Sequence, residues 1–203
     1  MSTESSTRNP AGIPRAGGAL SRAVGRGVLS LAGWRIEGAV PDRPHLVVCV
    51  APHTSNWDFV IGYAAKMALG VRAHWLGKHT LFRGPRGPLM RAMGGIPVDR
   101  GAAHGVVAQV AARFRREPQL VLGVAPEGTR RKVDRWKTGF YHIAREAGVP
   151  IWPVALDWGA RVVRLGVPLA PTGEEAADIE TLQGFFRRVR GRNPERAFPP
   201  AEP

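Results

Sequence analysis

His53 and Asp58 stand five residues apart in the segment His-Thr-Ser-Asn-Trp-Asp, directly after a short apolar run. An imidazole can take a proton from an attacking hydroxyl, and a carboxylate beside its other ring nitrogen sets the tautomer. The pair therefore predicts a general base with Asp58 as its orienting partner. A second interpretation stays open, because Ser55 and Asp58 also have the spacing of a helix capping box, which requires no catalysis.

A second segment with chemical potential is Pro-Glu-Gly-Thr-Arg at 126–130, which follows another apolar run. The backbone N–H groups of Gly128 and Thr129 could face an anion. The planar guanidinium of Arg130 matches the oxygens of a phosphate group. The alternative is a tight Pro-Glu-Gly turn followed by a solvated basic run.

Two further segments place glycine, proline and charge at the edges of apolar runs. Residues 94–100 end in Asp99-Arg100, and residues 149–155 hold two prolines in an apolar context. Taken singly, the first is explained by a strand end with an Asp-Arg ion pair. The second is explained by a plain core or edge strand.

Strands and helices must alternate to position these segments. Strands are expected over 45–50, 71–76, 96–98, 119–125, 149–156 and 161–167, and helices over 58–69, 102–116, 138–147 and 174–190. This alternation predicts a single α/β domain with a mostly parallel or mixed central sheet flanked by helices. The first two segments would then lie at the carboxyl ends of strands, where α/β folds place reactive side chains.

A short basic amphipathic helix is predicted over 19–33. Leu20, Val24, Val28 and Leu31 recur at helical spacing on it. It either packs on the core or lies in a membrane interface, with its basic face toward lipid headgroups. We expect a disordered tail over 1–18, a domain over 19–190, and a loose Pro-rich tail over 191–203.

The chain has 203 residues and a net charge of +13, so its partners are expected to be anionic: nucleic acid, an acidic membrane surface, or an acidic carrier or substrate. The single cysteine, Cys49, excludes an internal disulfide framework and a Cys-rich zinc site, and it fits a reducing, cytoplasmic setting. No stretch is long and apolar enough to span a bilayer.

Together and in this order, the four segments resemble the four motifs of the glycerolipid acyltransferase family, the 1-acylglycerol-3-phosphate acyltransferases and their relatives. The resemblance covers roughly residues 28–168, and residues 34–38 are similar to the family's lead-in strand. Two positions depart from the family pattern: Ala125 stands where an aromatic residue is usual, and Pro97 stands where an aromatic or aliphatic residue is usual. We expect both to line the substrate pocket.

The resemblance implies a glycerol-3-phosphate acyltransferase-like fold and transfer of a fatty acyl group from acyl-CoA or acyl carrier protein to a lysophospholipid hydroxyl. The simplest acceptor is 1-acylglycerol-3-phosphate, which would give phosphatidate. His53 would be the base and Asp58 its partner, and Glu127 would hold the acceptor hydroxyl or organise the loop. The acceptor phosphate and the oxyanion would be bound by Arg130, Gly128 and Thr129, with Lys78 and Arg100 as secondary candidates. Neither a metal nor a cofactor is implied.

Three alternatives remain at this point. The same chemistry could serve another lysolipid or the hydroxyl of a specialised metabolite, or the chain could be an inactive relative. A non-catalytic nucleic-acid-binding protein would also explain the basic charge, but the basic residues are dispersed and no RNA-recognition or zinc-finger signature is present. We expect a cytoplasmic protein that is peripheral on the inner face of the membrane.

Overall fold

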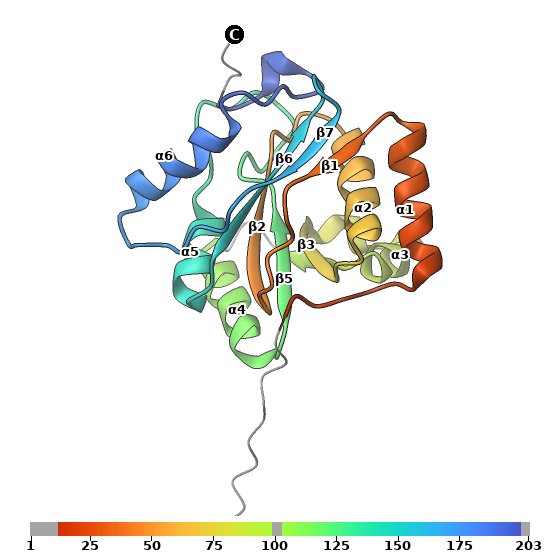
Figure 1. The fold of residues 1–203 in the computed structure, drawn as a ribbon. Coiled ribbons are helices and arrows are strands. Elements are labelled where there is room, and N and C mark those ends of the chain that lie inside the picture. The colour runs from red at the N-terminus through yellow and green to blue at the C-terminus, as the bar shows by residue number, and fades with distance from the viewer. Residues whose placement is uncertain (1–11, 99–102, 200–203) are drawn as a thin grey trace, which may run out of the picture.

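The computed structural model describes residues 12–98 and 103–199. Seven strands form one sheet in the order β1-β7-β6-β2-β5-β3-β4, and all neighbours are parallel except β6 and β7 (Figure 1). The strands are β1 (Arg35–Glu37), β2 (His45–Ala51), β3 (Ala73–Lys78), β4 (Gly95–Val98), β5 (Leu120–Val124), β6 (Ile151–Asp157) and β7 (Val162–Leu165). The expected single α/β domain with a mixed sheet is confirmed.

Helices cover both faces of this sheet. One face carries α1 (Ala19–Leu31) and α2 (Trp57–Leu69), and the other carries α4 (Ala103–Arg116), α5 (Gly139–Ala147) and α6 (Glu175–Phe186) (Figure 1). Shorter helices are η1 (His79–Phe82), α3 (Arg86–Ala92) and η2 (Pro194–Arg196). In β2, Leu46 and Val48 join the core on the α1–α2 side, whereas Val47 and Cys49 join the other core. This explains why β2 is apolar throughout rather than alternating.

The N-terminal helix α1 packs on α2, but not through its apolar stripe. Gly25 and Leu29 are the buried residues, and a Cβ on Gly25 would lie 2.7 Å from the Ala64 carbonyl oxygen. Glycine therefore allows the two helices to approach closely. The predicted stripe faces outward: the exposed fraction is 79% for Leu20 and 93% for Leu31. The interpretation in which the helix packs on the core is therefore confirmed, but the contact is made by Gly25 and Leu29 and not by the apolar stripe.

Both expected tails are more ordered than predicted where the structure describes them. Ile13 is buried, the Ala16 N–H donates to Gly70 O, and Arg15 pairs with Val71. Residues 12–18 are thus held by the burial of Ile13 and by backbone contacts with Gly70 and Val71. Residues 191–199 are not loose: Gly191 and Ala197 are buried, Asn193 is bonded to Thr54, and Phe198 O accepts the Trp136 Nε1–H. Residues 1–11 and 200–203 of the two tails lie outside the described residues.

The last helix ends four residues earlier than predicted. It ends at Phe186, after which the Val189 N–H donates to Phe186 O and the Trp158 N–H donates to Arg190 O. Val189 is buried. After the helix, the chain therefore folds back across the carboxyl end of β6. This turn brings the C-terminal segment next to the strand ends described below.

Candidate active site

Three neighbouring parallel strands end at one edge of the sheet and carry the reactive groups. β2 lies between β5 and β6 and runs parallel to both. His53 follows β2, Glu127 follows β5, and Trp158 follows β6. Because the carboxyl ends of parallel strands share an edge, segments about 75 to 100 residues apart in the chain meet there.

The imidazole and carboxylate predicted from spacing lie side by side. His53 Nδ1 is 3.3 Å from Asp58 Oδ2, and the side chain of Asp58 is fully buried while that of His53 is 21% exposed. The same Oδ2 accepts the backbone N–H groups of Thr54 and Ser55, each at 2.7 Å. The same carboxylate oxygen thus faces the His53 ring and accepts the Ser55 N–H, which is one of the two bonds of a capping box. A proton on Nδ1 would leave Nε2 unprotonated and able to accept a proton.

Glu127 is wholly buried beside this pair. Its Oε1 accepts the backbone N–H of His53 at 2.8 Å, and its Oε2 has no hydrogen-bond partner among the described residues. Burial, with a smaller contribution from the nearby Asp58, raises the pKa of Glu127 to about 7 against the lowering effect of the His53 N–H. Glu127 therefore ties the loop after β5 to the loop after β2, and it carries a proton in part of the molecules at neutral pH.

The loop that follows Glu127 turns sharply. Gly128 has φ +64°, a left-handed conformation that glycine adopts without strain, and its N–H donates to Ala125 O at 3.1 Å. That bond occupies the Gly128 N–H, so the expectation that it faces an oxyanion is not met. The N–H of Thr129 has no such partner within the described ranges and remains a candidate donor.

The expected phosphate ligands lie at the rim rather than in contact with the dyad. Arg130 and Lys78 are exposed, and within the part of the chain described here neither forms a hydrogen bond or ion pair. Lys78 ends β3, which is parallel to β5, so it shares the carboxyl edge with His53. Arg100 lies outside the described residues.

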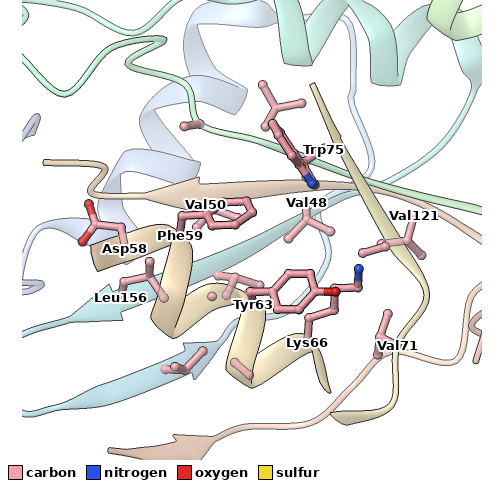
Figure 2. Close-up of a pocket in the computed structure, with 18 of the residues that line it drawn as sticks. Val48, Val50, Asp58, Phe59, Tyr63, Lys66, Val71, Trp75, Val121 and Leu156 are labelled. Atoms are coloured by element: carbon pink, nitrogen blue, oxygen red, sulfur yellow. The ribbon is translucent and has the colours of Figure 1, made fainter. Parts of the chain in front are cut away.

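An apolar cavity of about 240 Å³ begins at the dyad and extends beneath α2 (Figure 2). Asp58 lies at one end, and Phe59, Tyr63 and Lys66 line it from successive turns of α2. The sheet closes the other side through Val48, Val50, Trp75, Val121, Trp152 and Leu156. The sequence predicted a substrate pocket bordered by Ala125, but not that its wall would be formed by α2. The feature of the sequence that could have indicated the cavity is a pair of small residues on α2, Gly62 and Ala65, which both line it.

The family model described as Acyltransferase matches residues 35–157. The chain belongs to the acyltransferase family. It is 33% identical over 158 residues to a 1-acyl-sn-glycerol-3-phosphate acyltransferase of Haemophilus influenzae, covering 72% of this chain and 62% of that protein. The protein of the same name from Escherichia coli is 29% identical over 170 residues, covering 79% and 66% respectively. This chain thus spans less than two thirds of these relatives' length.

The fold of this acyltransferase is also found in a solved structure. The 1-acyl-sn-glycerophosphate acyltransferase PlsC from Thermotoga maritima superposes with a TM-score of 0.57 at 19% identity, covering 82% of this chain and 76% of that one. The likeness concerns the fold. No helix in residues 12–98 or 103–199 is both long and apolar enough to cross a membrane.

The two positions where this acyltransferase departs from the family pattern have different surroundings. Ala125 lines the apolar cavity, as expected. Pro97 does not, because it lies in β4 at the edge of the sheet and borders a separate hollow against α4, with Arg113 and Arg116. Of these two positions, only Ala125 borders the cavity, where its small side chain occupies less space than the aromatic residue usual in the family.

Proposed function

We propose that this acyltransferase moves a fatty acyl group from a thioester, acyl-CoA or acyl carrier protein, to the hydroxyl of 1-acylglycerol-3-phosphate. The observation that carries the proposal is the placement of the His53–Asp58 pair at the mouth of an apolar cavity. An acyl chain in that cavity would have its carbonyl carbon near the imidazole. The names of the relatives from Haemophilus influenzae and Escherichia coli support the choice of acceptor.

The chemistry follows from the groups present. His53 Nε2 takes the proton of the acceptor hydroxyl while its oxygen bonds to the thioester carbonyl carbon. Asp58 faces the imidazolium that forms and stabilises its charge. The oxyanion that forms accepts hydrogen bonds from N–H groups, and the backbone N–H of Thr129 is the candidate donor. When the intermediate collapses, the C–S bond breaks, and the imidazolium returns its proton to the departing thiolate.

Direct transfer fits better than an acyl-enzyme. Cys49 is buried in β2, where burial and the charge of Glu127 raise the pKa of its thiol well above the ordinary value. A protonated, inaccessible thiol is a poor nucleophile.

The test is thiol release from palmitoyl-CoA by the purified protein, with and without lysophosphatidate, and a repeat with carrier-linked donor. Lysophosphatidate-dependent release is the expected result. Release that depends instead on a lysolipid without a phosphate monoester, or on a non-lipid alcohol, would show that lysophosphatidate is not the acceptor. No release with any donor and acceptor pair would overturn the proposal.

The Arg130→Ala variant is expected to raise KM for lysophosphatidate about 10- to 100-fold with little change in kcat. The reason is that a charge-assisted hydrogen bond to phosphate has about this strength. Arg116→Ala removes the same charge from the exposed end of α4, at the opposite edge of the sheet, and serves as the matched control. Equal KM values for both variants and wild type would exclude Arg130 as the phosphate ligand.

We also propose that α1 binds the membrane through its exposed stripe, Leu20, Val24, Val28 and Leu31. An apolar stripe flanked by basic residues such as Arg26 is typical of interfacial helices. This arrangement would deliver a lipid acceptor to the dyad without extracting it fully into water.

Replacing Leu20 and Leu31 together with glutamate is expected to weaken binding to phosphatidylglycerol vesicles by about 100-fold or more, since each leucine contributes about 1.5–3 kcal/mol when buried. Co-sedimentation measures the effect. Val167→Glu is the control, because Val167 is 84% exposed but does not belong to α1. If Val167→Glu weakens binding as much as the α1 variant does, the stripe is not the binding surface.

A further inference from the structure

Trp158 makes a contact with the dyad that the motifs do not include. It follows β6 and lies one residue beyond the region that the family model matches. Its indole Nε1–H donates to Asp58 Oδ1 at 2.8 Å, while Oδ2 of the same carboxylate faces His53. Together with the N–H groups of Thr54 and Ser55, this contact leaves the carboxylate a single orientation.

The C-terminal segment Arg190–Asn193 holds Trp158 in place. The Trp158 N–H donates to Arg190 O at 2.8 Å. The guanidinium of Arg192 lies 4.8 Å from the centre of the Trp158 ring and 5.3 Å from that of Trp57. The indole also packs against Trp34 in a T-shaped contact, with the two ring centres 4.9 Å apart. The indole is therefore fixed from several directions before any substrate binds.

The same segment also holds the loop that carries His53. Asn193 Nδ2 donates to Thr54 O at 2.8 Å, and the Asn193 N–H donates to Thr54 Oγ1 at 3.2 Å. Gly191 packs so closely that a Cβ there would lie 3.1 Å from the Thr54 side chain. Thr54 adjoins His53 in the chain, so residues 190–193 contact both halves of the site.

We propose that Trp158 is a positioning residue for the His53–Asp58 dyad, and that Arg190–Asn193 complete the active site by holding Trp158 and Thr54. The physical basis is preorganisation: a carboxylate whose oxygens are held by fixed donors keeps the imidazole aimed during proton transfer. The kinetic part of this inference rests on the proposed acyl transfer.

The decisive variant is Trp158→Phe, which keeps an aromatic ring under Arg192 and removes the N–H. Its kcat is expected to fall about 10-fold with KM unchanged, because loss of a hydrogen bond to a charged group has about this size. Trp136→Phe is the matched control. Trp136 is buried, whereas Trp158 is half-buried; like Trp158 it donates its Nε1–H, here to Phe198 O of the C-terminal segment at 2.9 Å, and no hydrogen bond joins it to His53 or Asp58 among the described residues.

A second variant, Arg192→Met, removes the cation above both indoles and is expected to lower kcat about threefold. Because Arg192 is exposed, this variant should fold even if Trp158→Phe does not. Equal losses of kcat in Trp158→Phe and Trp136→Phe would mean that general loosening of the C-terminal segment is responsible, and this would overturn the positioning role. So would a kcat within twofold of wild type in both Trp158→Phe and Arg192→Met.

Nitrogen NMR of His53 provides a readout that needs no turnover. In the wild type the ring proton is expected on Nδ1, facing Asp58; in Trp158→Phe we expect a mixture of both tautomers. An unchanged tautomer would contradict the inference. If the wild-type protein shows no acyl transfer with any substrate pair, the proposed function fails, and the tautomer alone decides the role of Trp158.

Discussion

Replacing His53 with alanine is expected to lower kcat by about 10²–10⁴-fold, the usual contribution of a general base. The fold should remain intact, since the imidazole is partly exposed and the His53 contact to Glu127 is made by the backbone N–H. Asp58 is a less clean target. Its carboxylate accepts three N–H groups, from Thr54, Ser55 and Trp158, and removing it would leave these buried or half-buried donors without that acceptor.

The measurement is thiol release at saturating donor and acceptor, with far-ultraviolet circular dichroism to check folding. His142→Ala is the matched control, because His142 is half-buried on α5 and pairs with Glu175 rather than with the dyad. Added imidazole should restore part of the turnover of His53→Ala and change nothing in His142→Ala. Near-normal turnover in His53→Ala would exclude the general-base role.

Glu127→Gln is expected to remove a pH dependence of stability worth about 3 kcal/mol. The carboxyl titrates near its ordinary value of 4.5 in the unfolded chain but near 7 in the folded protein. Between these values the folded state binds more protons, so stability falls as pH rises from 4.5 to 7, and the full penalty persists above pH 7. Each pKa unit corresponds to about 1.4 kcal/mol, which gives this magnitude.

Urea unfolding at pH 5 and pH 8 measures the effect. The loss of unfolding free energy between pH 5 and pH 8 should be about 2.5 kcal/mol smaller in Glu127→Gln than in the wild type, since the unfolded carboxyl is already largely ionised at pH 5. Glu146→Gln, at an exposed position on α5, should keep the wild-type pH dependence. If Glu127→Gln also keeps it, the carboxyl is not the group that titrates near neutral pH.

The strands and most helices could be predicted from local patterns. The apolar runs that became β2, β5 and β6 are short and bounded by Gly or Pro, and α2 and α5 end at Gly70 and Gly148 in left-handed conformations. Hydrophobic periodicity is a property of neighbouring residues, and it therefore predicts strands and helices without knowledge of the fold. The predicted end of α6 was wrong, because the chain leaves the helix after Phe186 and Arg190 O accepts the Trp158 N–H. Periodicity does not indicate such a contact.

The orientation of α1 shows a limit of the same reasoning. Helical spacing correctly identified the apolar stripe but could not say whether it faces the core. The structure buries Gly25 and Leu29 instead, because glycine allows α1 to approach α2 at backbone distance. Side-chain hydrophobicity alone does not reveal such a close contact.

By itself, the sequence determined the α/β class, the dyad spacing and the four motifs of an acyltransferase, since these depend on residues close together in the chain. Only the tertiary structure decided that Glu127 binds the His53 backbone and that Trp158 holds Asp58. These contacts join residues up to 100 positions apart. They arise from the order in which parallel strands meet at one sheet edge, which no local pattern encodes.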